Sequence, residues 1–123
     1  MSTQALLIED RATIRDSLIP ALKEIADIEV VAFAETAKEG IALFERYEAT
    51  WQLAVIDLFL REGSGMEVIR AIKPVANGRP IVVLTNYATD AMRNACADAG
   101  AEIVFDKSTE IETFFDFCAD RFL

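Results

Sequence analysis

The sequence predicts an α/β domain in which helices cover both faces of a doubly wound parallel sheet. Two observations support this fold class. Short apolar runs rich in Val and Ile alternate with longer segments whose apolar residues recur at helical spacing. The connections between these segments are short, and no linker, internal repeat or low-complexity stretch interrupts the 123 residues. The whole chain is therefore expected to form one domain.

Five runs are expected to be strands, and their continuous apolar character indicates burial on both faces, as in a parallel sheet. The runs are ALLI (5–8), IEVVAF (28–33), LAVID (53–57), IVVLT (81–85) and EIVF (102–105). The common order for five such strands is 2-1-3-4-5, the flavodoxin-like arrangement. Ligands of such sheets bind outside the carboxyl ends of the strands, near the switch between strands 1 and 3.

Five amphipathic segments are expected to be helices, at roughly 11–26, 36–49, 64–74, 88–99 and 109–121. Three of them begin with Ser or Thr followed three residues later by Glu, the pattern of a capping box. These pairs are Thr36 with Glu39, Ser64 with Glu67, and Thr109 with Glu112. Gly100 follows the fourth helix as a natural C-cap. Phe117 lies off the apolar stripe of the last helix and is a candidate contact for a partner or a second copy.

Composition excludes several functions. The net charge is −9 and basic clusters are absent, which argues against direct binding to nucleic acid. The chain has no histidine, so it holds no Ser-His-Asp triad, His-ligated metal or phosphohistidine. No apolar run approaches the roughly 20 residues that cross a membrane, and no signal peptide is evident. The expected location is cytoplasmic, and Cys96 and Cys118 are expected to be buried thiols.

Polar side chains follow four of the five strands, which are neighbours in the predicted order. They are Glu9 and Asp10 after the first strand, Asp57 at the end of the third, Thr85 and Asn86 at the end of the fourth, and Lys107 after the fifth. Asp10 and Asp57 would repel each other unless one is protonated or a cation lies between them. Mg²⁺ is the cation that fits best, because it takes one or two carboxylates together with substrate phosphate.

This set of groups suits phosphoryl transfer to a carboxylate. A transferring phosphoryl group carries dispersed negative charge, so catalysis consists mainly of positioning and electrostatic stabilisation. Asp57 projects from a central strand and is the preferred nucleophile. Lys107, the Thr85 hydroxyl and the backbone N–H of Asn86 would contact the phosphoryl oxygens.

Four motifs together resemble response-regulator receiver domains, the CheY-like family, over essentially the whole chain. They are LLIED (6–10), VIDLFLREGSGMEVI (55–69), VVLTNYA (82–88) and AEIVFDKS (101–108). The resemblance implies that Asp57 is the phosphoacceptor and that Thr85 and Lys107 contact the phosphoryl group. It also implies that Asp10, Asp57 and the carbonyl of Phe59 bind Mg²⁺, with Glu9 acting mainly through metal-bound water.

The resemblance further implies the partners. A sensor histidine kinase or a histidine phosphotransfer protein would donate the phosphoryl group. Phosphorylation would then repack the face formed by the fourth helix, the fifth strand and the fifth helix, which would bind a downstream protein, or the chain would relay phosphate. The chain would catalyse its own phosphorylation and dephosphorylation without turning over a separate substrate, and a homodimer is left open.

Residues 1–123 are expected to be one receiver domain without an output domain, although an excised piece of a larger regulator would read the same. Val104 stands where the family commonly has an aromatic residue coupled to movement of the Thr. Asn86 is larger than the residue usual after that Thr. The alternative function is therefore a degenerate receiver that binds partners without phosphorylation. A phosphoester hydrolase is disfavoured because Phe59 stands where those enzymes have a second Asp.

Overall fold

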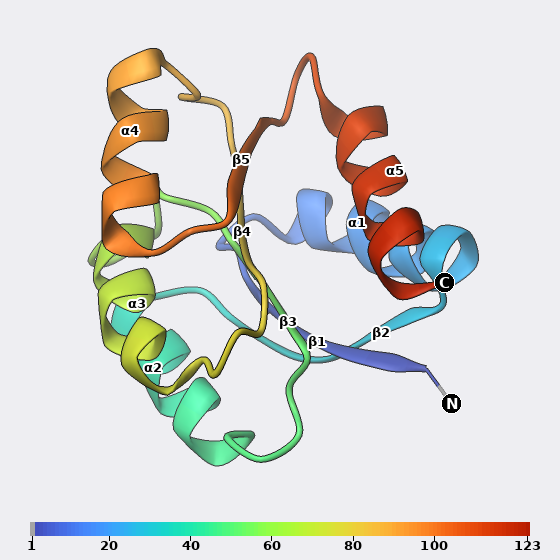
Figure 1. Cartoon of the computed structure of the whole chain (residues 1–123), viewed down its shortest axis with the longest axis horizontal. Coiled ribbons are helices and arrows are strands. Elements are labelled where there is room, and N and C mark those ends of the chain that lie inside the picture. Colours follow the sequence, from blue (N-terminus) through green and yellow to red (C-terminus); the bar gives the residue numbers. More distant parts are fainter. Residues whose placement is uncertain (1) are drawn as a thin grey trace.

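The computed structural model describes residues 2–123, which form one five-stranded parallel sheet between two layers of helices (Figure 1). The strand order is β2-β1-β3-β4-β5, as predicted. The strands are β1 (Thr3–Ile8), β2 (Ile28–Ala34), β3 (Leu53–Ile56), β4 (Ile81–Thr85) and β5 (Ile103–Asp106). Each neighbouring pair is parallel, so the carboxyl ends of all strands meet at one edge of the sheet.

Helices lie on both faces of this sheet, as predicted. The helical elements are α1 (Ala12–Ala26), α2 (Ala37–Arg46), α3 (Gly65–Ile72), the short 3₁₀ turn η1 (Lys73–Val75), α4 (Asp90–Ala99) and α5 (Ile111–Phe122). Helices α1 and α5 pack on one face, and α2, α3 and α4 pack on the other (Figure 1).

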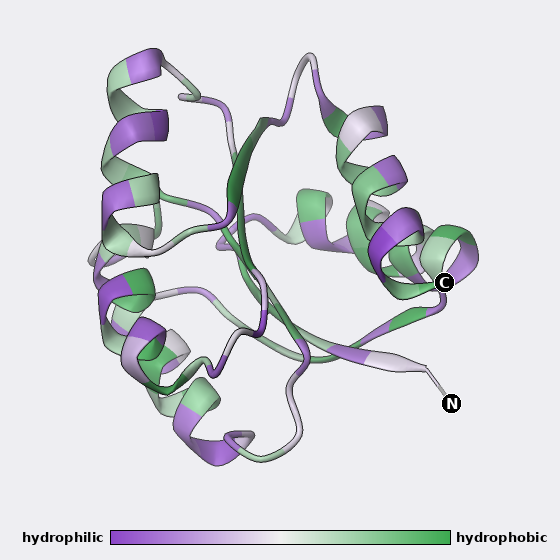
Figure 2. Ribbon diagram, viewed as in Figure 1, coloured by the Kyte–Doolittle hydropathy of each residue, from purple (hydrophilic) through white to green (hydrophobic). Residues whose placement is uncertain are grey.

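The strands divide their side chains between two cores. In β3, Ala54 and Ile56 join the core under α2, α3 and α4, whereas Leu53 and Val55 join the core under α1 and α5. This alternation follows from the two-residue period of a strand, and it explains why the runs are apolar at every position. Figure 2 shows the hydrophobic residues concentrated along the strands, while the helices alternate hydrophobic and hydrophilic residues.

Val104 and Phe105 point to opposite faces of β5, as the strand period predicts. Phe105 lies in the core under α1 and α5, where its ring centroid is 5.7 Å from that of Phe117. Phe117 is therefore half-buried against this core, and its contact with a partner or a second copy stays a prediction.

Two of the three predicted helix starts are confirmed. At α3, the Ser64 side chain accepts the Glu67 N–H and the Glu67 side chain accepts the Ser64 N–H, which completes a capping box. At α2, Thr36 accepts the Glu39 N–H, but the Glu39 carboxylate accepts the Thr36 hydroxyl rather than its backbone N–H.

The predicted capping box of Thr109 with Glu112 is wrong. Helix α5 begins at Ile111, and its N-cap residue Glu110 makes no side-chain cap bond. The reason is local, because the Asp106 carboxylate accepts the N–H groups of Ser108 and Thr109 and holds them in a turn. The helix starts only where this turn ends.

The C-cap prediction is confirmed at α4, where Gly100 has a φ of +119° that side-chain-bearing residues rarely adopt. Both cysteines are buried thiols, as predicted. Burial raises the pKa of the Cys118 thiol to about 12, so it stays protonated and unreactive.

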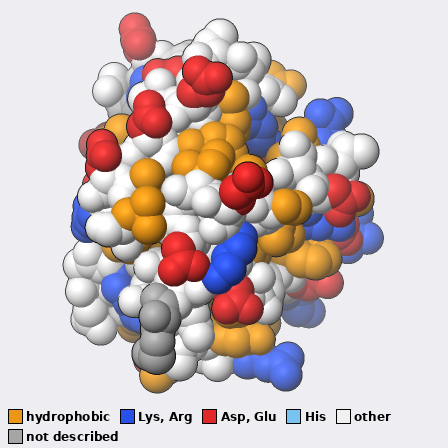
Figure 3. Space-filling view, turned by 90° about the vertical axis from the view of Figure 1, so that its right-hand side faces the viewer, with side chains coloured by type: hydrophobic (Ala, Val, Ile, Leu, Met, Phe, Trp, Pro, Cys, Tyr) orange, Lys and Arg blue, Asp and Glu red, His pale blue; other side chains and the backbone are white. Residues whose placement is uncertain are grey.

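Within residues 2–123, no helix combines the length and the apolar character needed to span a bilayer. The face that carries α1 and α5 shows acidic and basic side chains interspersed with hydrophobic ones (Figure 3). Charge on this face is therefore mixed in sign and not gathered into a basic patch.

Candidate functional site

A pocket opens at the carboxyl edge of the sheet, where the fold class predicts a binding site. The loops that follow β1, β3, β4 and β5 all contribute to it. Its lining residues are Asp10, Arg11, Asp57, Phe59, Leu60, Asn86, Tyr87 and Lys107. Five of the seven predicted site residues line this pocket, and the other two, Glu9 and Thr85, are buried beside it.

Three carboxylates converge at this edge. Glu9 and Asp10 follow β1, and Asp57 follows β3, which is the neighbouring strand. The backbone N–H of Glu9 donates to the Ala34 carbonyl, and that of Asp57 donates to the Ile8 carbonyl, so both residues remain tied to the sheet. One oxygen of each carboxylate lies within 4.8 Å of the others. The sheet thus fixes the acidic cluster that the sequence predicts.

Lys107 is the cation of this cluster. Its Nζ lies 2.5 Å from Glu9 Oε1 and 3.0 Å from Asp57 Oδ2, and its side chain is only 8% exposed. Lys107 forms no ion pair with the adjacent Asp106, whose carboxylate accepts the backbone N–H groups of Ser108 and Thr109. One ammonium therefore contacts two buried carboxylates, and the partly exposed carboxylate of Asp10 lies beside them.

The electrostatics of this arrangement favour binding of a further cation. Burial raises the pKa of the Glu9 carboxyl above its usual value; the Lys107 hydrogen bond opposes this change, and the charge of Asp57 adds to it. The carboxylates exceed the ammonium in number, so the site carries uncompensated negative charge. Hard oxygen ligands at this spacing fit Mg²⁺, which binds through few carboxylates and keeps several waters.

Gly65 supports the site from below, and the sequence reading missed it. A Cβ at this position would lie 2.1 Å from the backbone oxygen of Asp57. The Gly65 N–H also donates to the Leu58 carbonyl at 2.9 Å. Only glycine allows the start of α3 to approach the Asp57 backbone this closely. The signal in the sequence was a glycine directly after the Ser64 N-cap, where a close approach leaves no room for a side chain.

Thr85 and Asn86 form the β4 side of the site. Thr85 is fully buried, and its hydroxyl accepts the N–H of Tyr87 at 3.2 Å. The Thr85 carbonyl accepts the N–H of Lys107 at 2.9 Å, which joins the ends of β4 and β5. Asn86 is exposed and lines the pocket, and its side-chain oxygen lies 3.4 Å from the Ser108 hydroxyl.

Two aromatic rings meet at the mouth of the pocket. The centroids of Phe59 and Tyr87 are 4.3 Å apart, although 50% of Phe59 and 56% of Tyr87 remain exposed. Sequence reasoning assigned Phe59 a role for its carbonyl alone and did not foresee this ring pair. The two residues lie on different loops, so nothing in the local pattern connects them.

Arg15 of α1 supports the acidic cluster from the outside. Its guanidinium donates to the Glu9 carbonyl at 2.9 Å and to the Glu35 carboxylate at 3.0 Å. The same group lies 4.1 Å from the centroid of the Phe33 ring. Arg15 is buried on the side of α1 that also buries Leu18 and Leu22. The sequence signalled this role only by placing an arginine at helical spacing from those two leucines.

Comparison with known proteins gives one consistent result. The family model for the response regulator receiver domain matches residues 5–117. The transcriptional regulatory protein YdfI of Bacillus subtilis is 28% identical over 112 residues, which are 91% of this chain and 51% of that protein. The chain thus spans about half the length of the curated relatives it matches.

Solved structures share the fold. A DNA-binding response regulator of the LuxR family from Staphylococcus aureus superposes with a TM-score of 0.84 at 17% identity, covering 97% of both chains. The receiver domain of a DNA-binding response regulator from Colwellia psychrerythraea gives 0.84 at 19% identity, covering 98% of both. These identities establish likeness of fold.

Proposed function

The chain belongs to the response regulator receiver domain family of two-component systems, and from this premise we propose that it accepts a phosphoryl group on Asp57. The observation that carries the proposal is Lys107 Nζ, which lies 3.0 Å from Asp57 Oδ2 inside a pocket that opens at the carboxyl edge of the sheet. A buried carboxylate beside an ammonium and an open pocket is suited to nucleophilic attack on a bound phosphoryl group.

The proposed reaction moves a phosphoryl group from a phosphohistidine nitrogen to an Asp57 oxygen. The N–P bond breaks, its electron pair stays on the histidine, and a new O–P bond forms at the carboxylate. Lys107 and the Thr85 hydroxyl would donate to the phosphoryl oxygens, with the Asn86 N–H as a further donor. Preorganised donors of this kind stabilise developing negative charge.

Receiver domains bind Mg²⁺ at an acidic site, and this chain has an acidic cluster of the required chemistry. We propose that Asp10, Asp57 and the Phe59 carbonyl hold the ion directly and that Glu9 acts through its water. When bound, Mg²⁺ supplies positive charge that screens the carboxylates and the phosphoryl oxygens.

Receiver domains take phosphate from histidine kinases, so the proposed donor is a sensor kinase or a histidine phosphotransfer protein, in the cytoplasm. Phosphorylation would bias a two-state equilibrium. The face formed by α4, β5 and α5 would then bind a downstream protein or a second copy of this chain, or the chain would pass the phosphate on.

The test is incubation with Mg²⁺ and acetyl phosphate, followed by intact-mass analysis. We expect the wild type to gain the mass of one phosphoryl group and Asp57→Asn to gain none. Asp27→Asn is the matched control, because it removes an exposed carboxylate at the opposite end of the sheet and should leave labelling unchanged.

Two outcomes would contradict the proposal. Labelling of Asp57→Asn at the wild-type level would reject Asp57 as the acceptor. Failure of the wild type to take label from acetyl phosphate or from any phosphohistidine donor would instead support a degenerate receiver that binds partners without phosphorylation.

A further inference from the structure

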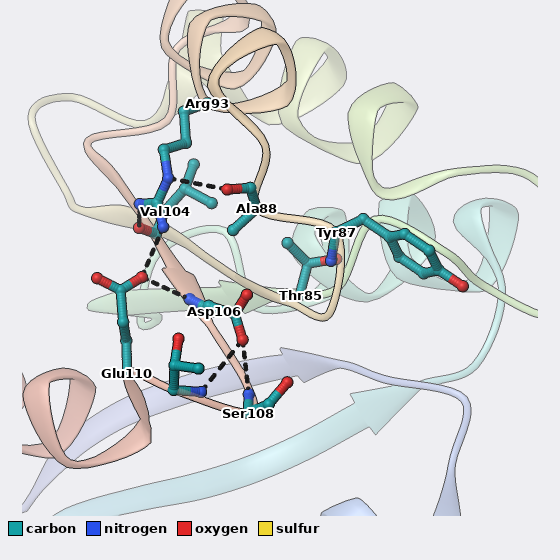
Figure 4. Close-up of polar contacts among 9 residues, drawn as sticks. Thr85, Tyr87, Ala88, Arg93, Val104, Asp106, Ser108 and Glu110 are labelled. Atoms are coloured by element: carbon teal, nitrogen blue, oxygen red, sulfur yellow. Dashed lines mark hydrogen bonds and ion pairs between the residues drawn. The ribbon is translucent and has the colours of Figure 1, made fainter.

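Arg93 of α4 joins three separate segments of the chain (Figure 4). Its Nε donates to the Ala88 carbonyl at 3.1 Å, Nη1 donates to the Val104 carbonyl at 2.6 Å, and Nη2 donates to Glu110 Oε1 at 2.6 Å. The planar guanidinium offers donors in a fixed fork, so these three contacts hold their segments in one relative position.

Glu110 extends this connection toward the pocket. The same Oε1 accepts the N–H of Asp106 at 2.9 Å, and Asp106 directly precedes Lys107 (Figure 4). Arg93 lowers the pKa of the Glu110 carboxyl, which is therefore ionised at neutral pH. The pair thus contacts two backbone groups of β5 itself, the Val104 carbonyl and the Asp106 N–H, close to the carboxyl end of the strand.

Both bridged segments carry residues of the proposed site. Ala88 directly follows Tyr87 and lies three residues beyond Thr85, while Lys107 directly follows Asp106. The two segments also meet at the pocket, where the Lys107 N–H donates to the Thr85 carbonyl. Arg93 and Glu110 therefore hold the loop after β4 and the end of β5 in one relative position, next to the point where Thr85 and Lys107 meet.

Val104 makes this connection significant. The family commonly has at this position an aromatic residue coupled to movement of the Thr, and this chain has no ring there. In this chain, the Arg93 guanidinium supplies one connection between the β5 backbone and the loop after β4, because it binds the carbonyls of Val104 and Ala88.

We propose that Arg93, acting through Glu110, is a positioning residue for phosphoryl transfer to Asp57. It fixes the loop that follows Thr85 and bears Asn86 relative to the turn that bears Lys107. This proposal rests on the proposed function, because it concerns the rate of that reaction.

The chain offers a matched control for this connection. Arg121 pairs with Glu102 at 2.8 Å, and the two side chains are 41% and 38% exposed. The side chains of Arg93 and Glu110 are similarly exposed, at 36% and 34%. That pair links α5 to the residue just before β5, at the end of the strand away from the pocket. If the Arg93–Glu110 pair only stabilised the fold, its loss should change the rate of phosphorylation no more than the loss of the Arg121–Glu102 pair at the other end of β5.

The experiment compares Arg93→Ala, Arg93→Lys and Arg121→Ala with the wild type. Phosphorylation is followed over a series of acetyl phosphate concentrations at saturating Mg²⁺, so that maximal rate and half-saturating concentration are separated. Mg²⁺ affinity is measured by calorimetry and folding by thermal unfolding. The conservative Arg93→Lys keeps the charge and tests the proposal if Arg93→Ala folds poorly.

We expect Arg93→Ala to lower the maximal rate by about tenfold or more, since small displacements of catalytic groups have effects of this size. Arg93→Lys should fall between, because lysine keeps the pair with Glu110 but lacks the fork. Mg²⁺ affinity should be unchanged in both, because Arg93 contacts none of the three carboxylates. Arg121→Ala should react at the wild-type rate.

Equal maximal rates for the folded Arg93 variants and the wild type would overturn the proposal, as would equal losses in Arg93→Ala and Arg121→Ala. In both cases the wild type is labelled, so the proposed function stands. A wild type that takes no label overturns the proposed function first and the positioning role with it. The two failures are therefore distinguishable.

Discussion

Two lysines, one at each end of the sheet, make contacts that look alike and differ in burial. Lys107 at the carboxyl end lies between Glu9 and Asp57, and all three side chains are less than one tenth exposed. Lys23 at the opposite end lies 2.8 Å from Asp27 and 2.6 Å from the Ser2 hydroxyl, and about half of the Lys23 and Asp27 side chains is exposed.

The difference in burial distinguishes an ion pair on the surface from an ion pair inside a candidate binding site. Water screens the exposed pair, and such pairs contribute little to stability. Burial of Glu9 and Asp57 instead costs free energy of desolvation, and one ammonium shared between these two carboxylates, with Asp10 close by, does not offset it. Such a cluster is better explained by the chemistry it supports than by any gain in stability.

The largest expected effect comes from removing each lysine in turn. Lys107→Met would leave Glu9 and Asp57 buried without their cation, and removal of one partner of a buried pair costs about 3–5 kcal/mol of unfolding free energy. Lys23→Met should change the unfolding free energy little. Urea unfolding with a chelator present measures both, and equal losses would break the comparison between the two ends.

A smaller loss is expected from the glycine beneath Asp57. Gly65→Ala places a Cβ against the Asp57 backbone oxygen, and overpacking of this kind costs about 1–3 kcal/mol, or more when backbone must move. Gly78 has no neighbouring atom within 4 Å of an added Cβ, but its φ is +80°, so Gly78→Ala reports backbone strain alone. Thermal unfolding should rank Gly65→Ala as the more destabilising; the reverse ranking would show that the close contact relaxes cheaply.

Removal of one ring at the pocket mouth should have a kinetic effect. The Phe59–Tyr87 pair covers part of the approach to Asp57, and exclusion of water slows hydrolysis of a reactive intermediate. We expect Tyr87→Ala to speed loss of the phosphoryl group a few-fold, measured by intact mass after the donor is removed. Tyr47→Ala, at the end of α2, is the control, and an unchanged lifetime in Tyr87→Ala would dismiss the rings as a barrier.

The smallest expected effect is a difference in the direction in which the pKa values of Glu9 and Asp27 shift. Burial raises the pKa of Glu9, whereas the hydrogen bond from Lys23 lowers that of Asp27. The stability from Glu9 is thus fully present below its unfolded pKa and lost as pH rises through the folded pKa. The stability from Asp27 is present above its unfolded pKa and lost as pH falls through the folded pKa.

Carboxyl carbon chemical shifts of the metal-free chain, followed by NMR over a pH series, measure both values. Lys23→Met should return Asp27 toward its ordinary pKa and leave Glu9 unchanged. Shifts of the two carboxyls in the same direction would show that burial does not distinguish the two ends.

The sheet and the acidic edge could be predicted because both leave local marks in the sequence. Buried parallel strands are continuous apolar runs, and strands that run parallel bring their terminal residues together. Asp57 and Lys107 are 50 positions apart, yet each directly follows or ends a strand, so the topology alone predicted their meeting.

Other features could not be predicted, because they depend on which backbone groups a side chain meets once the chain is folded. Two of the three acceptors of Arg93 are backbone carbonyls, which every residue has, so no side-chain pattern marks them. The start of α5 was missed because the Asp106 carboxylate accepts the Thr109 N–H, which the Glu112 side chain would accept in the expected capping box. The contact of Gly65 with Asp57 depends on how closely α3 approaches the end of β3.

Strand β2 forms one border of the sheet, and among residues 2–123 no further strand lies beside its outer backbone groups. Such a border is a template on which another copy could add a strand and begin aggregation. Three features disfavour that event. Glu29 places a charge on the border, the register of β1 and β2 shifts between Ala5 and Leu6, and the Arg15 guanidinium lies over the half-exposed Phe33 ring. Arg15, which binds the Glu9 carbonyl beside the acidic cluster, thus also covers part of an exposed aromatic side chain on the border strand.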